Sequence, residues 1–217
     1  MIDPFTNKVM LMDLSLFLRG LLIGFSIAAP VGPIGVLCIR RTLANGRVTG
    51  FVSGLGAATA DACYGSIAAL GLTLIAAFLI DQANWLRLIG GAYLCYLGIK
   101  TFRSKPAAQA AEVEGRSLLG AYTSTLLLTL TNPMTILSFA AIFAGLGAGA
   151  ASGNVWGALL LVAGVFVGSC TWWMILVTLT SLFRSRLSTV GLGWVNRVSG
   201  VIICVFGGIA LYGIIAA

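Results

Sequence analysis

The sequence predicts an all-α membrane protein with six transmembrane helices, arranged as two inverted repeats of three helices each. Of the 217 residues, 59% are hydrophobic and only 9% are charged, whereas charged residues make up about a quarter of a typical soluble domain. Long apolar runs follow one another along the chain, and a spanning helix needs about 20 such residues. A polar stretch near the middle divides the runs into two groups of three.

The apolar runs place the predicted spans, in order, at residues 14–39, 48–80, 85–102, 117–143, 155–183 and 191–216. Residues 1–9 lack this pattern and are typical of a leader derived from a cloning vector. The two repeats then cover 10–103 and 117–217, joined by a cytoplasmic linker at 104–116. Because three is an odd number, homologous halves lie upside down relative to one another, as in many secondary transporters.

The 13 Lys and Arg residues predict the orientation of the spans. Lys8, Arg19 and Arg87 lie on one face, and ten lie in the first, third and fifth connections on the other. Such residues concentrate on the cytoplasmic side. We therefore expect a multi-pass membrane protein with both termini outside the cytoplasm. The ten cytoplasmic cations are Arg40, Arg41, Arg47, Lys100, Arg103, Lys105, Arg116, Arg184, Arg186 and Arg197.

Prolines interrupt two of the predicted spans. Span one contains Pro30, Gly32 and Pro33, and span four contains Asn132 followed by Pro133. Proline removes a backbone donor and frees a carbonyl, and at membrane depth such groups need protein or a watery cavity around them. We therefore expect helices 1 and 4 to be broken at Pro, with the resuming helix N-termini facing an interior that suits an anionic group. A kink that only aids helix packing is the alternative.

Asp61 is the only acidic residue deep in a predicted span. It follows Arg47 by 14 residues, which is about 21 Å along a helix and near the middle of a hydrocarbon core of about 30 Å. Because a carboxylate there costs at least about 2.5 kcal/mol, we expect a cation or proton site. Thr59, Tyr64 and Thr131 are its candidate polar neighbours. A structural carboxyl bonded to the broken backbone is the alternative.

Together these features predict a binding site for a small zwitterion. An amino acid would place its carboxylate at a helix break and its ammonium near Asp61, with its side chain against the apolar wall. Trp172 and Trp173 fall in the middle of span five, where either one is a candidate wall of such a cavity. Glycines such as Gly20 and Gly24 let helices approach closely, which favours packing within one subunit over a homodimer interface.

Three motifs resemble those of the LysE/RhtB family of bacterial amino-acid exporters: the Ala-Pro-x-Gly-Pro element of span one, the glycine-rich stretch ending in Asp61, and the Asn-Pro pair of span four. The likeness covers nearly the whole chain after the leader. It implies a location in the bacterial inner membrane and export of amino acids or related metabolites by proton antiport. It also implies functional roles for the prolines, glycine, asparagine and aspartate of these motifs. Where some members have Gln-Asn or Asn after Gly-Pro, this chain has Ile34-Gly35, so the substrate stays open.

Other functional classes are disfavoured by the composition. The chain has no histidine, which excludes a Ser-His-Asp triad and a His-ligated metal, so we expect no enzyme, no cofactor and no bound metal. A thiol-relay membrane protein needs matching cysteines in its two halves, and Cys38 and Cys63 have no such counterparts. The chain has no basic cluster interleaved with aromatic residues, which is the pattern that would indicate nucleic-acid binding. A heavy-metal or divalent-cation exporter of the same superfamily is the alternative function, although one Asp supplies few oxygen ligands.

Overall fold

The structure is a computed structural model that describes residues 4–30, 32–70, 78, 81–104, 117–132, 135–139, 155–184 and 189–215. Within these ranges the chain is helical and contains no strand, which confirms the all-α class. The main helices are α1 (Pro4–Ala28), α2 (Pro33–Asn45), α3 (Arg47–Ala69), α5 (Ala83–Phe102), α7 (Leu118–Leu130), α9 (Val155–Arg184) and α10 (Thr189–Ile215).

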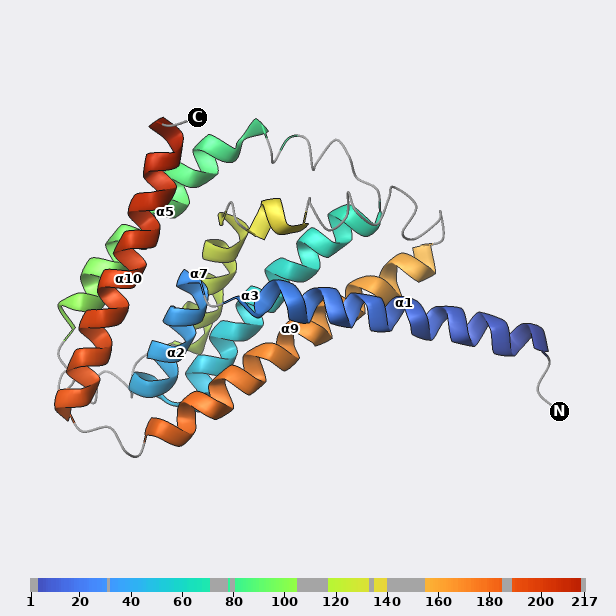
Figure 1. Cartoon of the computed structure of the whole chain (residues 1–217), viewed down its shortest axis with the longest axis horizontal. Coiled ribbons are helices and arrows are strands. Elements are labelled where there is room, and N and C mark those ends of the chain that lie inside the picture. The colour runs from blue at the N-terminus through green and yellow to red at the C-terminus, as the bar shows by residue number, and fades with distance from the viewer. Residues whose placement is uncertain are drawn as a thin grey trace.

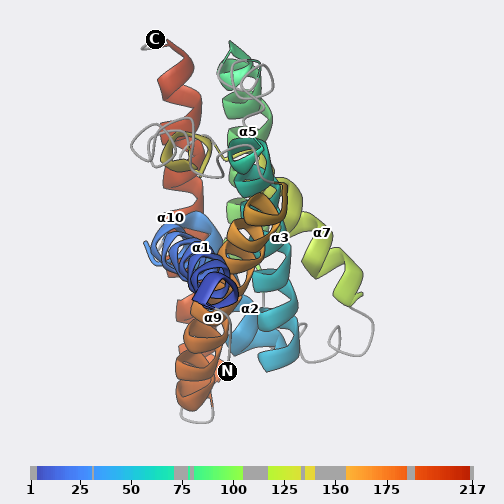
Figure 2. The same ribbon diagram turned by 90° about the vertical axis from the view of Figure 1, so that its right-hand side faces the viewer.

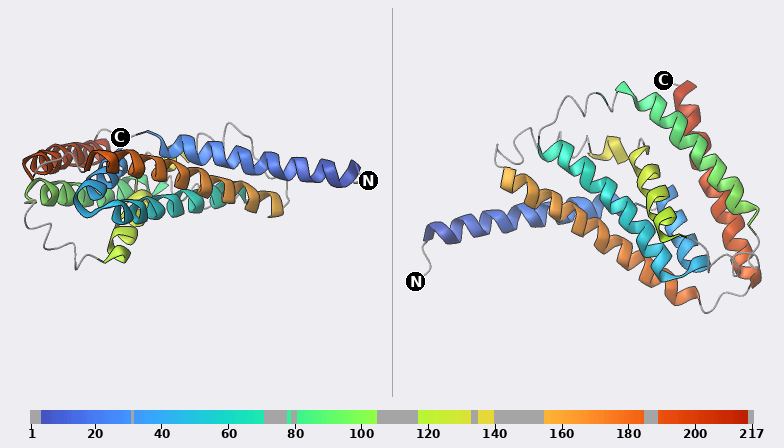
Figure 3. Two further views of the ribbon diagram at one scale, coloured as in Figure 1. Left: turned by 90° about the horizontal axis from the view of Figure 1, so that it is seen from below. Right: turned by 180° about the vertical axis from the view of Figure 1, so that it is seen from behind.

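The helices form two groups that diverge from one another (Figure 1). In one group α5 and α10 run side by side along their length. In the other, α9 packs against both α1 and α3, and α3 also contacts α7. Helix α2 joins the groups, because it contacts α3 and α9 as well as α10 (Figure 2). The N-terminal part of α1 projects beyond the other helices (Figure 3).

The first predicted span is interrupted where its prolines lie. Helix α1 ends at Ala28 and α2 begins at Pro33, and their axes differ by 81°. Gly32 caps α2 with extended backbone angles (φ −97°, ψ −163°), and Pro33 suits the first helical position, where an N–H would have no partner in the helix. Helix α2 ends at Asn45 and is capped by Gly46, whose φ of 98° lies in the left-handed region that favours glycine.

The fourth predicted span also stops early. The Ser117 side chain accepts a hydrogen bond from the Gly120 amide and caps the start of α7. The helix ends at Leu130, and residues 135–139 are helical again. The Asn132 carbonyl accepts hydrogen bonds from two amides of this second helical piece. Pro133 itself lies outside the described residues.

Two of the described helices are long and apolar enough to cross a membrane, the segments Val155–Phe183 and Val190–Ile214. The bent pair of α1 and α2 makes a third if it counts as one span. Helices α3 and α5 reach 23 and 20 residues, but α3 is rich in glycine and alanine and α5 carries Arg87 and Lys100. They fall short of the hydropathy of the other spans.

The predicted domain boundaries are only partly within the described ranges. Helix α1 begins at Pro4, so residues 4–9 of the predicted leader are helical and continuous with the rest of α1. Helicity does not reveal where these residues came from, and the leader remains a prediction. Residues 105–116, which make up nearly all of the predicted linker, lie outside the described ranges.

Glycines bring α1 and α9 into backbone contact. A Cβ atom on Gly20 would overlap the Leu161 carbonyl, and one on Gly24 would overlap the Val165 carbonyl. Gly164 is equally tight in the opposite direction, against the backbone of α1. The predicted glycine positions therefore serve packing between helices of one chain.

Candidate functional site

A small cavity lies beside the break between α1 and α2, and we name it the deep cavity. Its volume is about 70 Å³. The break, α3, α9 and the residues at and beyond the end of α7 all contribute to its walls. The lining residues are Ile27, Ala28, Pro30, Gly32, Pro33, Ile34, Gly35, Ala57, Asp61, Thr129, Asn132, Thr135 and Trp173.

Asp61 is the acidic group of the deep cavity. Its side chain, on α3, is buried, with 3% of its surface exposed. The carboxylate Oδ2 accepts a hydrogen bond of 2.7 Å from the Ser169 hydroxyl of α9. The Ser169 oxygen in turn accepts one of 3.1 Å from the Trp173 indole N–H. A neutral hydroxyl thus donates to the carboxyl group, and none of the described residues that line the cavity is basic.

The structure brings five predicted site residues together around this one cavity: Pro30, Gly32, Pro33, Asp61 and Asn132. They come from segments that are far apart in the sequence. The first turn of α2 lines the cavity, so the positive end of that helix dipole lies at the same space as the carboxyl group. This arrangement offers a partial positive charge and a negative group within one small volume.

Three other predicted neighbours do not line the deep cavity. The Thr59 oxygen accepts a hydrogen bond of 3.0 Å from the Tyr122 hydroxyl on the side of α3 that faces α7. The Tyr64 hydroxyl donates to the Leu130 carbonyl at the end of α7. The Thr131 hydroxyl donates to a carbonyl one turn back in its own helix, at 2.9 Å. These groups support the helices around the cavity.

Sequence reasoning missed two polar lining residues and the hydrogen-bond donor to Asp61. Thr129 and Thr135 flank the second interruption, and Ser169 bonds the carboxylate. Trp173 is one of the two mid-span tryptophans named as candidates, and it is the one that lines the cavity. Within the described ranges, no three His, Cys, Asp or Glu side chains group together as metal ligands.

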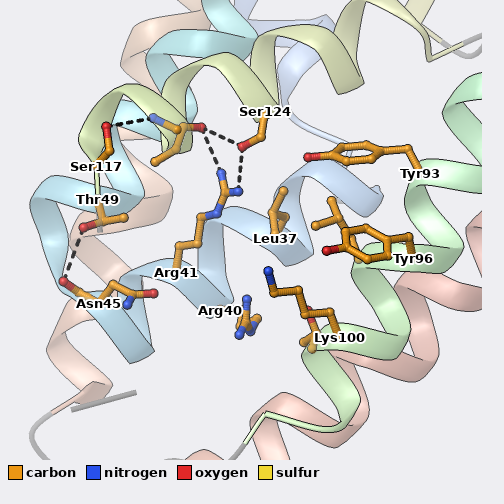
Figure 4. Close-up of a pocket in the computed structure, with 14 residues that line it drawn as sticks. Leu37, Arg40, Arg41, Asn45, Thr49, Tyr93, Tyr96, Lys100, Ser117 and Ser124 are labelled. Carbon is orange, nitrogen blue, oxygen red and sulfur yellow. Dashed lines mark hydrogen bonds between the residues drawn. The ribbon is translucent and has the colours of Figure 1, made fainter. Parts of the chain in front are cut away.

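A second, larger cavity lies between α2, α5 and α7, and we name it the basic cavity (Figure 4). Its volume is about 360 Å³. Three cationic side chains contribute to its wall. The lining residues are Leu37, Arg40, Arg41, Asn45, Thr49, Tyr93, Tyr96, Leu97, Lys100, Thr101, Ser117, Gly120, Ala121 and Ser124.

The Arg41 guanidinium ties α2 to α3 and α7. One terminal nitrogen, Nη1, lies 2.9 Å from the Ser53 hydroxyl on α3. On α7 the same nitrogen lies 2.7 Å from the Thr125 hydroxyl and 2.9 Å from the Ala121 carbonyl. The other nitrogen, Nη2, donates to the Ser124 hydroxyl at 2.8 Å. We name these contacts the Arg41 network.

The two cavities follow one another along α2 and α7. The first turn of α2 lines the deep cavity, and the basic cavity begins one turn later at Leu37. On α7, Thr129 lines the deep cavity and Ser124 lines the basic cavity. Leu37, at the end of the basic cavity, and Leu128, between Ser124 and Thr129 on α7, have only 1% and 2% of their surfaces exposed. We name these two buried leucines and the Arg41 network the closed layer.

Arg40 and Arg41 lie within a helix, and not in the connection in which the sequence predicted them. Helix α2 continues through both residues to Asn45. Arg40 is buried and donates to the Asn196 side-chain oxygen of α10 at 3.3 Å. The prediction ended span one at residue 39 because two arginines close an apolar run, but polar partners on α3, α7 and α10 accommodate both guanidinium groups.

Comparison with known proteins agrees with this picture. The model of the family described as LysE type translocator matches residues 25–213. The chain is 30% identical to the putative amino acid efflux protein YcgF of Bacillus subtilis over 198 residues, 89% of this chain and 94% of that protein. It is 27% identical to the threonine efflux protein of Escherichia coli K12 over 209 residues, 89% of this chain and 96% of that protein. No solved structure matches the chain significantly.

The relatives also include an uncharacterized membrane protein of Escherichia coli, YahN, which is 30% identical over 173 residues, 77% of this chain and 76% of that protein. Together with the long apolar helices, these matches identify a multi-pass membrane protein. The family model spans both interrupted segments and the Asp61 region between them. The chain therefore belongs to the LysE family of translocators.

Proposed function

We propose that this translocator is a secondary active exporter of amino acids or related small zwitterions, which works by proton antiport around the deep cavity. In this proposal the chain forms six spans as two inverted repeats of three, with both termini outside the cytoplasm. The cations counted in the sequence, including those of the basic cavity, then lie on the cytoplasmic side of the inner membrane.

One observation carries the proposal: a buried carboxyl group and the N-terminal end of a broken helix line the same cavity. A zwitterion has both a carboxylate, which suits the positive end of α2, and an ammonium, which suits Asp61. The names of the amino acid and threonine efflux proteins among the relatives fit this substrate class.

Antiport follows if proton and substrate compete for Asp61. The carboxyl group cannot hold a proton and also form an ion pair with the substrate ammonium. Protonation from outside would then release the substrate, and deprotonation toward the cytoplasm would restore the binding site. Exclusive occupancy of one group by either ligand links the outward movement of substrate to the inward movement of a proton.

The cavity must enlarge during this cycle. Its volume of about 70 Å³ is well below the roughly 300–1,000 Å³ of pockets that bind small molecules. Toward the basic cavity it is closed by the two buried leucines and the Arg41 network. We propose that this layer is the cytoplasmic closure and that it opens when the site faces the cytoplasm.

Replacement of Asp61 tests the proposal. The purified protein is reconstituted in liposomes with an imposed pH gradient, and uptake of individual amino acids is measured, beginning with threonine. We expect Asp61→Asn to reduce gradient-driven transport to the level of empty liposomes, because an amide neither exchanges a proton nor pairs with an ammonium. Insertion and thermal stability should change little, since an amide oxygen can still accept from Ser169.

The matched control is Asp81→Asn, which removes the same charge at an exposed position next to α5. This variant should transport like the wild-type protein. Proton-coupled transport at the wild-type rate by Asp61→Asn would remove Asp61 from the mechanism. Absence of any amino-acid flux in the wild-type protein, across the whole set of amino acids, would contradict the substrate class.

A further inference from the structure

Three cationic side chains line the basic cavity. Arg40 and Arg41 contribute from α2 and Lys100 from α5, while the lining residues from α3 and α7 are neutral. No acidic side chain is among the described residues that line it. Asp61 belongs to the deep cavity, and Asp81 precedes Lys100 by 19 residues, about 28 Å along a helix. Glu112 and Glu114 lie outside the described residues.

The three cations differ in how their own groups are engaged. The Arg41 nitrogens donate to α3 and α7, and Arg40 donates to Asn196 of α10. Lys100 is exposed, and within the described part of the chain its recorded partner is the Tyr96 ring, 5.8 Å from the ammonium nitrogen. The ammonium of Lys100 is therefore the group best placed to meet a ligand, with the arginines adding to the field.

Hydroxyl groups accompany this charge. Tyr93 and Tyr96 come from α5, one turn apart, and their hydroxyls point into the cavity (Figure 4). Ser117 and Ser124 line the opposite wall. Cations combined with neutral hydrogen-bond donors suit a carboxylate or phosphate, because both carry several acceptor oxygens. The volume of about 360 Å³ falls in the range of small-molecule sites.

We infer that the basic cavity is an anion-binding site that engages a carboxylate or phosphate group through Lys100, before the closed layer that leads to Asp61. The anion has two candidate sources, the carboxylate of a cytoplasmic amino acid and the phosphate of an anionic lipid in the same leaflet. The amino-acid source rests on the proposed export function, whereas the lipid source does not.

Lys100→Gln tests this inference, with Arg103→Gln as the matched control. Arg103 carries the same charge at the same end of α5, is exposed, and does not line the cavity. A role of these cations in membrane orientation alone would make the two variants equivalent. Lys100→Arg retains the charge and should restore the behaviour of the wild-type protein.

The first measurement is threonine transport in liposomes made only of phosphatidylcholine, with threonine supplied on the cytoplasmic face. If the site binds the substrate carboxylate, Lys100→Gln raises the half-saturating concentration by about three- to tenfold, and the maximal rate is preserved. The second measurement is binding of phosphatidylglycerol to the detergent-purified protein, followed by native mass spectrometry. If the site binds a lipid phosphate, Lys100→Gln weakens this binding by a similar factor, and Arg103→Gln does not.

An effect on transport alone identifies the carboxylate, and an effect on lipid binding alone identifies the phosphate. Equal behaviour of Lys100→Gln and Arg103→Gln in both measurements overturns the inference. If the wild-type protein transports no amino acid, the proposed function fails, but the lipid measurement still decides whether the basic cavity binds an anion.

Discussion

The Arg41 network predicts that one arginine keeps the cytoplasmic closure shut. The informative change is Arg41→Lys, which retains the positive charge but replaces the planar guanidinium and its two terminal nitrogens with a single ammonium. The guanidinium reaches Ser53 on α3 with Nη1 and Ser124 on α7 with Nη2. One ammonium cannot serve acceptors that are placed around two separate nitrogens. We therefore expect the link between α2 and its neighbours to weaken while the charge of the cavity is preserved.

The size of the effect follows from the bonds that are lost. Hydrogen bonds to a charged group contribute about 1.5–3 kcal/mol each. The hydroxyls left behind keep other partners, since Ser53 donates to the Thr49 carbonyl at 2.8 Å and Thr125 donates to the Ala121 carbonyl at 3.0 Å. At about 2 kcal/mol each, within this range, loss of one to two bonds then costs about 2–4 kcal/mol in the closed state. Even the lower figure raises the population of the open state about 30-fold.

Cys38 reports on this opening. It lies one turn before Arg41 on α2 and is fully buried, with 0% of its surface exposed. In a chain whose other cysteines are replaced by alanine, the rate at which N-ethylmaleimide modifies Cys38 follows the open population. We expect Arg41→Lys to raise this rate about 30-fold. The control is Arg47→Lys, an exposed position at the start of α3, which should leave the rate unchanged.

A melting curve recorded for each variant separates local opening from general unfolding. If Arg41→Lys melts like the Arg47→Lys control and Cys38 is still modified at the wild-type rate, the Arg41 network does not hold the closure shut. The leucines alone would then separate the two cavities.

Two further predictions concern helix packing and are checked by thermal unfolding in detergent. Gly24→Ala should destabilise the protein by about 1–3 kcal/mol, because the new methyl group would overlap the Val165 carbonyl of α9. The control Gly208→Ala, where a Cβ meets no atom within 4 Å, should stabilise it by about 0.5–1 kcal/mol. A change in stability of the same sign in both variants would contradict the packing of Gly24 against α9. Tyr64→Phe removes the hydrogen bond to the Leu130 carbonyl and should cost about 0.5–1.5 kcal/mol, or about 1–6 °C in Tm. An unchanged Tm would show that this bond contributes nothing to stability.

The sequence was most informative where a residue is costly in a bilayer. Prolines within an apolar run require an interruption, and a carboxyl group at that depth requires polar surroundings. Both rules lead to the same place, because Pro30, Pro33 and Asp61 line one cavity. Helical periodicity also carries information that the neighbour assignment overlooked. Thr59 precedes Asp61 by two residues, and positions two apart lie on different faces of a helix.

The rest depends on contacts between distant segments, which a single sequence does not display. Ser169 follows Asp61 by 108 residues, and nothing in its own surroundings marks it as the hydrogen-bond donor to that carboxylate. The basic cavity was missed for a different reason. Arginine and lysine near the end of an apolar run predict orientation, and that explanation accounts for Arg40 and Arg41 without assigning them partners. Their partners on α3, α7 and α10 appear only in the folded chain.

The pairing of helices restricts how this translocator can change shape. Helices from the first half of the chain lie against helices from the second, α1 on α9 and α5 on α10. Swinging one half as a rigid block against the other would pull both pairs apart. A less disruptive motion keeps α5 and α10 together and rotates this pair as a rigid unit about α2. The pair makes most of its contacts with the remaining helices through α2. This rotation would move the face of α5 that carries Tyr93 and Lys100 toward or away from α7. The same motion would therefore narrow or widen the basic cavity.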